Sequence, residues 1–219
     1  MNKNDTTIPV LVIGAGGHAR AVIALLRRLD REILACVDAA GSSGPDSMAG
    51  VPVLRGDDAV LTREPGRVLL ANGIASTGRP TVRQAVFERF KSNGYAFATL
   101  VDPAACVFDD AELGEGCQVL AGAVIQTGAR LAENTLVNTR AVVEHDCRIG
   151  RHCHVAPGAI LSGGVTLGDG CHIGIAAAVL QGLSVGAGGV VGGGAAVVND
   201  VAAGETVVGV PARPLNDRA

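Results

Sequence analysis

The chain has no Trp, one Tyr and four Phe among its 219 residues, although it contains 31 Gly. Nucleic-acid-binding proteins commonly stack bases on aromatic side chains or present a basic surface. This chain is poor in aromatics and carries a formal net charge of -3 at pH 7. We therefore expect no nucleic-acid partner.

Long apolar runs are also missing, even though 48% of the residues are hydrophobic and the mean hydropathy is +0.35. No stretch approaches the roughly 18 apolar residues that span a bilayer. Residues 1–9 are polar and include Asp5, unlike a secretory signal. These absences predict a cytoplasmic protein with no membrane partner.

The six Cys include no Cys-x-x-Cys pair, which disfavours a zinc ribbon. Gly has no strict every-third period, which excludes collagen. All five aromatic residues lie between positions 87 and 108. This change in composition predicts two domains, one over residues 1–100 and the other over residues 101–219.

The second domain carries a six-residue repeat. An aliphatic residue recurs seventeen times without a slip, from Val101 to Val197. A small or medium-sized residue follows four positions later each time, from Ala105 to Val201, and four of the six Cys occupy such positions. A helix of 3.6 residues per turn cannot keep this stripe aligned, so the pattern indicates a solenoid of short strands.

This repeat resembles the left-handed parallel β-helix of hexapeptide-repeat acyltransferases. The resemblance implies triangular coils of three repeats, with residues 18 apart stacked at about 4.8 Å. It also implies a homotrimer with active sites between subunits. A β-helix that serves only as a trimeric scaffold is the alternative.

The first domain begins with an apolar run at residues 8–13, the turn GAGGHA at 14–19 and a helical apolar stripe. A second strand over residues 33–37 ends at Asp38, the acidic position of a dinucleotide-binding fingerprint. The stripe consists of Val22, Leu25, Leu26 and Leu29. Together these elements predict a Rossmann-like α/β fold.

A further strand is predicted over residues 67–70 and a helix over 80–91, whose Val82, Val86 and Phe90 share one face. Residues 96–101 then lead into the solenoid.

The backbone amides of the Gly turn, at the N-terminus of the following helix, favour binding of a pyrophosphate. About 100 residues are few for an NAD-linked dehydrogenase, so a nucleotide-diphosphate sugar is favoured over NAD or a vestigial packing role.

The GAGGHA turn, VNTRAVVEHDCRIG from Val137 and VVGVPARPL from Val207 resemble a sugar acyltransferase family. Its members include sialic acid O-acetyltransferases and the N-acetyltransferases of bacillosamine and perosamine synthesis. The resemblance implies acetyl transfer from acetyl-CoA to the 4-amino group of a nucleotide-linked 4-amino-4,6-dideoxyhexose in bacterial surface glycan synthesis. O-acetylation of sialic acid or a related sugar hydroxyl is the alternative.

His145 and Asp146 lie between the interior positions Val143 and Cys147, so the repeat places both outside the core. An exposed His beside a carboxylate suits a general base, because the anion stabilises the imidazolium. The family has a catalytic His at the position of His145, next to an acidic residue. We expect direct transfer without an acyl-enzyme, since Cys147 faces the interior.

The resemblance implies two further sets of site residues. Gly163, eighteen residues after His145, would donate its amide to the thioester oxygen, and three other residues would also contact acetyl-CoA: His154, Ile175 and Gly193. The nucleotide sugar would bind to Gly16, Gly17, His18, Asp38 and Gly73. The family often has a second acidic residue where this chain has Ala39, so UDP and GDP sugars both remain open.

A zinc hydrolyase of the γ-carbonic-anhydrase type is a different function for such a solenoid. The spacings among His145, His152, His154 and His172 do not give a distant His followed by a His-x4-His pair. We therefore expect no metal. His152 and His172 receive no role.

Overall fold

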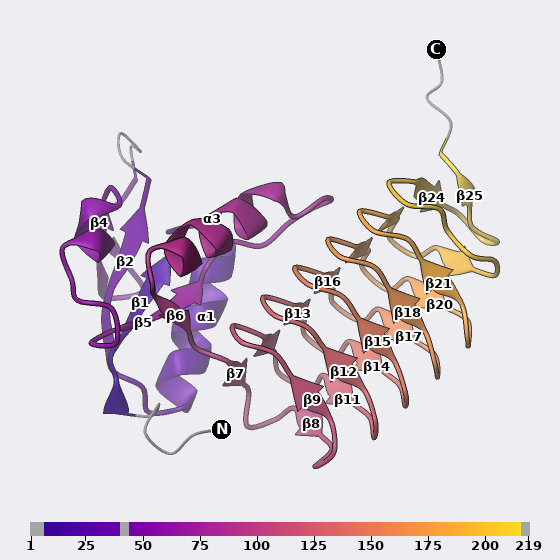
Figure 1. Ribbon diagram of the computed structural model, residues 1–219, viewed down its shortest axis with the longest axis horizontal. Helices are drawn as coiled ribbons and strands as arrows, with labels where there is room; N and C mark the ends of the chain where they lie inside the picture. Colours follow the sequence, from indigo (N-terminus) through magenta and orange to yellow (C-terminus); the bar gives the residue numbers. More distant parts are fainter. Residues whose placement is uncertain (1–6, 40–43, 216–219) are drawn as a thin grey trace.

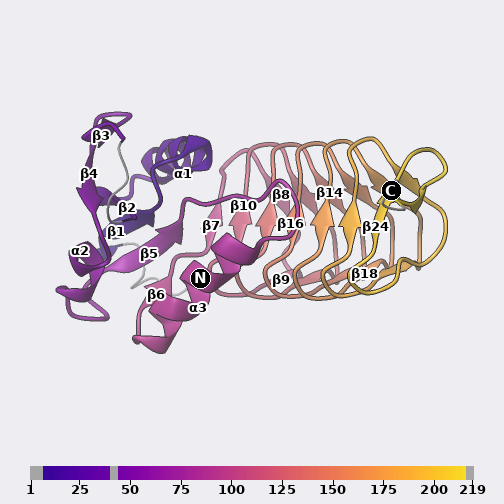
Figure 2. The same cartoon turned by 90° about the horizontal axis from the view of Figure 1, so that it is seen from above.

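A computed structural model describes residues 7–39 and 44–215. An α/β unit is followed by a long three-sided solenoid (Figures 1 and 2). Residues 1–6, part of the polar segment considered above, lie outside the described residues. No helix in the described ranges is long and apolar enough to cross a membrane.

The α/β unit contains one sheet with the strand order β3-β4-β2-β1-β5-β6. All its pairs are parallel except β3 with β4. The elements are β1 (Val10–Ile13), α1 (Gly17–Arg28), β2 (Ile33–Asp38), β3 (Ser47–Met48), β4 (Val51–Arg55), α2 (Asp58–Leu61), β5 (Leu69–Asn72), α3 (Thr81–Ser92) and β6 (Ala96–Phe97). Strands β2, β3 and β4 all lie on one side of β1, whereas β5 and β6 lie on its other side. The strand order therefore reverses between β1 and β5.

The apolar stripe of α1 packs as expected, with Val22, Leu25 and Leu26 buried and Leu29 partly buried. The strand predicted over residues 67–70 is displaced by two residues, because β5 covers Leu69–Asn72. Asn72 belongs to the strand although it is polar, since it is buried and hydrogen-bonded at the junction with the solenoid.

The apolar face expected for α3 is buried only in part, at Phe90 and Val86. Its buried residues are Arg83, Phe87 and Phe90, whereas the Val82 side chain is 62% exposed. The helix packs against the sheet and also meets the solenoid, where Arg83 donates to the Asn134 carbonyl. A charged residue therefore lies on the buried face, which an apolar pattern cannot detect.

The solenoid contains seventeen two-residue strands, each beginning six residues after the previous one. They are β7 (Leu100–Val101), β8 (Cys106–Val107), β9 (Glu112–Leu113), β10 (Gln118–Val119), β11 (Val124–Ile125), β12 (Arg130–Leu131), β13 (Leu136–Val137), β14 (Val142–Val143), β15 (Arg148–Ile149), β16 (His154–Val155), β17 (Ile160–Leu161), β18 (Thr166–Leu167), β19 (His172–Ile173), β20 (Ala178–Val179), β21 (Ser184–Val185), β22 (Val190–Val191) and β23 (Ala196–Val197).

Successive strands pass to three faces in turn. The first face contains β7, β10, β13, β16, β19 and β22; the second runs from β8 to β23; the third runs from β9 to β21. Partners on one face are 18 residues apart, as in Val143 opposite Leu161. The fold class and stacking expected from the repeat are confirmed. The α/β unit lies against the first face, where Leu100, Leu120 and Leu136 join its core.

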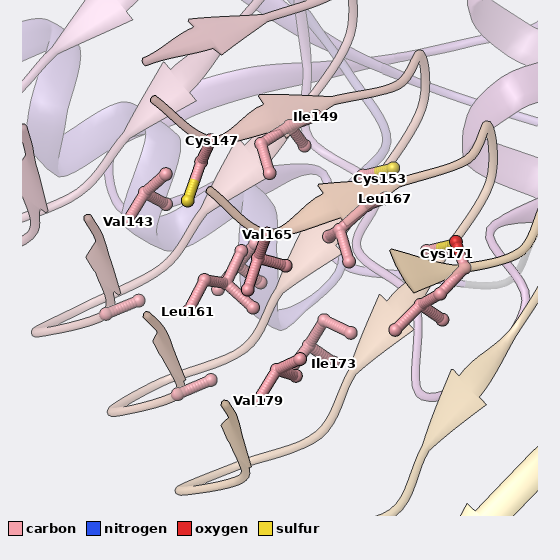
Figure 3. Packing of buried hydrophobic residues seen from close by; sticks show 14 of the residues in the cluster. Val143, Cys147, Ile149, Cys153, Leu161, Val165, Leu167, Cys171, Ile173 and Val179 are labelled. Atoms are coloured by element: carbon pink, nitrogen blue, oxygen red, sulfur yellow. The ribbon is translucent and has the colours of Figure 1, made fainter. Parts of the chain in front are cut away.

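The interior of the prism is narrow. The aliphatic position of each repeat points inward, as Val143, Leu161 and Val179 do, and the small position fills the remaining space (Figure 3). The four Cys at small positions are fully buried: Cys117, Cys147, Cys153 and Cys171. Rings have no room here, which explains why Phe108, the single aromatic residue among positions 101–219, is exposed.

The last coil is shorter than the others. Val207 of β24 (Thr206–Val208) pairs with Val191, and Val201 with Val185, each a spacing of 16 residues. Val201 therefore stacks on an aliphatic position, which corrects its expected small position. The chain then turns back, and β25 (Arg213–Pro214) pairs antiparallel with β24.

Truncation of an interior side chain tests this packing. Leu167 is 2% exposed, whereas its neighbour Thr166 points outward on the third face. We expect Leu167→Ala to lower the free energy of unfolding by about 2–5 kcal/mol, because it leaves a cavity in a rigid core. Thr166→Ala, the matched control, should change it by less than about 0.5 kcal/mol in urea unfolding. Equal losses would contradict the inward and outward assignment.

Candidate active site

A cleft of about 750 Å³ lies beyond the carboxyl ends of the parallel strands, where the strand order reverses. Open α/β sheets bind ligands at this place. The five residues expected to bind the nucleotide sugar all line it: Gly16, Gly17, His18, Asp38 and Gly73. Val82 and Val86 of α3 form one wall.

The glycines of this cleft occupy their positions for different structural reasons. A Cβ on Gly73 would lie 2.8 Å from the carbonyl oxygen of Ile13, so only Gly allows the segment after β5 to approach β1. A Cβ on Gly16 or Gly17 would meet nothing within 4 Å. These two residues begin α1 beside open space, where backbone amides favour an anion.

A second cavity of about 300 Å³ lies on the first face of the solenoid. His154, Ile175 and Gly193, three of the residues expected to contact acetyl-CoA, all line it. Ile175 is 62% exposed, so an apolar ligand arm would find contact area there. Ser76 and Thr77 line both cavities, which therefore adjoin.

Ser76 connects the two cavities through hydrogen bonds. Thr139 N donates to Asn138 Oδ1, so the Asn138 amide group donates to His154 Nε2 at 3.2 Å. The His154 proton is then on Nδ1 and is donated to the Ser76 carbonyl at 3.0 Å. The Ser76 hydroxyl lies 3.1 Å from His154 Nδ1 and 3.4 Å from His172 Nδ1.

Two imidazoles of this region, those of His154 and His18, stay neutral at physiological pH. Burial, with repulsion from His172 and then Arg83, lowers the pKa of His154 to about 3. Burial and the charge of Arg83 lower the pKa of His18 to about 4, although the hydrogen bond with Gln118 acts in the opposite direction and raises it.

The proton of His18 is fixed by its partner. Gln118 donates its amide proton to the Asn72 carbonyl at 2.9 Å, so its oxygen accepts from His18 Nε2 at 2.9 Å. His18 Nδ1 therefore keeps a lone pair. The side chain lines the cleft, where this nitrogen is suited to accept a hydrogen bond.

A fully buried Arg83 joins the α/β unit to the solenoid. Its guanidinium donates to the carbonyls of Asn72 at 3.2 Å, Ile74 at 2.8 Å and Asn134 at 3.3 Å. Burial lowers its pKa to about 10, which still leaves it charged. Arg83 thereby holds the segment between β5 and α3, which carries Gly73 and Ser76, against the first face.

His145 and Asp146 lie elsewhere, in the turn from β14 on the second face to β15 on the third. In a three-sided prism this corner is opposite the first face. His145 lines neither the cleft nor the solenoid cavity, so one chain does not bring it to them. His145 Nδ1 donates to Asp146 Oδ2 at 2.9 Å, and the side chains are 56% and 73% exposed. A Cβ on Gly163 would clash with His145 Nε2, so the imidazole covers this glycine.

The next Cys and the next His in the sequence, Cys147 and His152, have structural roles. Burial raises the pKa of the Cys147 thiol to about 11, and the thiol donates to the Ser162 carbonyl. His152 is buried at the domain junction, where its Nδ1 accepts from the Asn134 amide at 2.9 Å. Within residues 7–39 and 44–215, no group of three or more His, Cys, Asp or Glu side chains is arranged to hold a metal ion.

Two family models match the chain. The PglD N-terminal domain matches residues 9–90, and the bacterial transferase hexapeptide (six repeats) matches residues 128–163. No curated protein sequence matches it.

Solved structures are similar over nearly the whole chain. PerB from Caulobacter crescentus, in complex with CoA and GDP-perosamine, is 34% identical over 95% of this chain and 97% of its own, with a TM-score of 0.87. The acetyltransferase domain of PglB from Neisseria gonorrhoeae, in complex with acetyl coenzyme A, is 33% identical over 95% and 100%, with a TM-score of 0.86. WeeI from Acinetobacter baumannii is 29% identical over 95% and 100%, with a TM-score of 0.84. The chain therefore belongs to the PglD-type family of hexapeptide-repeat sugar N-acetyltransferases.

Sequence reasoning missed Ser76, Arg83, Gln118 and Asn138. Gln118 had a detectable signal, because it is a polar residue at the outward position of a strand, between the apolar Leu100 and Leu136 on the same face. The others have none, since their importance depends on how the α/β unit is placed on the solenoid.

The buried neutral His154 predicts acid sensitivity. Below pH 6.5 the unfolded chain binds a proton at this residue, whereas the folded chain does so only near its pKa of about 3. Stability should therefore fall as the pH falls through this interval. We expect His154→Gln to flatten the dependence of the unfolding free energy on pH between 6.5 and 4, measured by urea unfolding. The slope is compared, so any constant loss from the substitution cancels. Parallel profiles for the two proteins would contradict the assignment.

Proposed function

We propose that this enzyme transfers the acetyl group of acetyl-CoA to the 4-amino group of a nucleotide-linked 4-amino-4,6-dideoxyhexose in bacterial surface glycan synthesis. The supporting observation is the junction at Ser76 and Thr77, where the cleft of the α/β unit adjoins the cavity on the solenoid. The domain of residues 1–100 would bind the nucleotide sugar, and that of residues 101–219 the acetyl-CoA. PerB, a similar structure, is described with CoA and GDP-perosamine.

We assign each part of the nucleotide sugar to the residues of the cleft whose chemistry suits it. Gly16 and Gly17 offer amides to the diphosphate, His18 offers Nδ1 to the sugar, and Asp38 accepts from the nucleoside. Gly73 allows the ligand to approach the backbone. On the solenoid side, His154, Ile175 and Gly193 would contact acetyl-CoA. Acetyl-CoA is an intracellular substrate, so we keep the cytoplasmic location as part of the proposal.

In the proposed mechanism His145 is the general base. Its Nδ1 proton is held by Asp146 at 2.9 Å, so Nε2 is the basic nitrogen. Nε2 takes a proton from the amine as the nitrogen attacks the thioester carbon, and the Gly163 amide donates to the oxygen that gains charge. The imidazolium then returns the proton to the departing CoA thiolate. The high pKa of buried Cys147 disfavours a covalent acetyl-enzyme.

This mechanism requires a second copy of the chain, because His145 and the cleft are on opposite sides of one prism. The second face is suited to bind a copy, since its outward residues are apolar. They are Cys106, Val124, Val142, Ile160, Ala178 and Ala196, with Ile160 44% exposed. We propose a homotrimer in which His145 of one subunit serves the cleft of its neighbour.

Removal of the base tests the mechanism. We expect His145→Ala to abolish acetyl transfer, a loss of about 10²-fold or more, because no other group would take the amine proton. The loss is measured as thiol release from acetyl-CoA with UDP- and GDP-linked amino sugars. The oligomeric state, measured by light scattering, should not change because the side chain is exposed. Wild-type turnover would rule out this base, and release only with sialic acid would favour O-acetylation.

Mixed oligomers test whether the site is shared. A Cβ at Gly16 would meet nothing within 4 Å, so a Phe there should be accepted by the backbone and should place its ring in the cleft. Gly16→Phe and His145→Ala should each be inactive alone, whereas co-expressed chains should recover part of the activity. A His145 from one variant then serves the intact cleft of the other. Absence of recovery in verified mixed oligomers would show that each chain uses its own His145.

A further inference from the structure

The wall of the cleft that α3 forms presents apolar side chains to solvent. Val82 and Val86 are one turn apart on α3 and both line the cleft, with Val82 62% exposed. Phe87 and Phe90 of the same helix are fully buried, and Val86 is partly buried against them. Val82 and the exposed part of Val86 together offer an apolar surface in the cleft, which suits the face of a heterocyclic base.

An ion pair lies next to this wall. Arg89 of α3, one turn beyond Val86, pairs with Asp57, which precedes α2. The side chains are 49% and 39% exposed, and both line the cleft. A carboxylate and a guanidinium together present hydrogen-bond acceptors beside donors.

The strand order places this pair at one end of the cleft. Along the carboxyl edge of the sheet, Asp57 follows β4, Asp38 ends β2, the Gly turn follows β1 and Gly73 follows β5. Ser76, which borders the solenoid cavity, lies on the β5 side. A nucleotide sugar with its sugar near Ser76 and its diphosphate at the Gly turn therefore has its base near Asp57.

We propose that Asp57 and Arg89 bind the edge of a guanine, so that the acceptor is a GDP-linked sugar. This inference rests on the proposed function, which assigns a nucleotide sugar to the cleft. Guanine presents two adjacent donors, N1–H and N2–H, beside the acceptor O6. The two oxygens of Asp57 accept from both donors, and Arg89, which has five N–H groups, donates to O6 while keeping its contact with Asp57. Uracil presents acceptors on both sides of its single N–H, so its edge would repel the carboxylate.

Binding of nucleoside diphosphates to the full chain tests this assignment. We expect GDP to bind about tenfold or more tightly than UDP in isothermal titration, because a bidentate contact discriminates by that order. IDP, which lacks only the N2 amino group, should be intermediate. Asp57→Asn should weaken GDP about tenfold and leave UDP within about twofold, because the amide places a donor against a guanine N–H.

Asp58→Asn is the matched control, since this neighbouring carboxylate is not among the residues that line the cleft. It should leave all three affinities unchanged. UDP binding as tight as GDP, or an equal loss of all three ligands in Asp57→Asn, would overturn the guanine assignment while thiol release with a UDP-linked amino sugar still supports the function. Absence of binding by any diphosphate, together with no thiol release from acetyl-CoA, would overturn both.

Discussion

The backbone hydrogen bonds between coils are the constraint on which the rest of the structure depends. They pair residues 18 apart on each face, so a side chain can change position only if the whole coil changes. This register places His145 over Gly163 and His154 over His172. Such a scaffold holds polar groups without using the flexible loops that other folds need, and it keeps its reactive side chains on the outside because the interior accepts only small and aliphatic groups.

A second requirement is the attachment of the α/β unit, which depends on a buried charge. Arg83 has three carbonyl acceptors, and one of its terminal nitrogens has no hydrogen-bond partner among residues 7–39 and 44–215. Burial of an unpaired guanidinium is costly, and carbonyl dipoles offset part of that cost. Its positive charge also helps to keep His18 and His154 uncharged. One residue thus aligns the two cavities and adds to the effect of burial, which is the main reason that their imidazoles stay neutral.

The sequence predicted the solenoid well because a period of six depends only on local geometry and is repeated seventeen times. The Gly turn and α1 were predictable for a similar reason. The buried face of α3 was predictable only in part, since it contains the charged Arg83 as well as Phe90 at a junction between two units. Ser76 and Asn138 have meaning only when both cavities are in place. The repeat correctly placed His145 at an exposed corner. A single chain, however, does not show which part of a second subunit that corner would contact.

The shortened final coil bears on aggregation. Open β-helices expose unpaired strand edges to which further chains can add. Here the returning tail occupies them: β25 pairs with β24, Ala196 exchanges hydrogen bonds with Gly209 and Ala212, and Val201 pairs with Val185. Each of the three faces therefore ends in a hydrogen-bonded segment that breaks the coil geometry. The tail limits the solenoid to a finite length and protects its end from fibre-like growth.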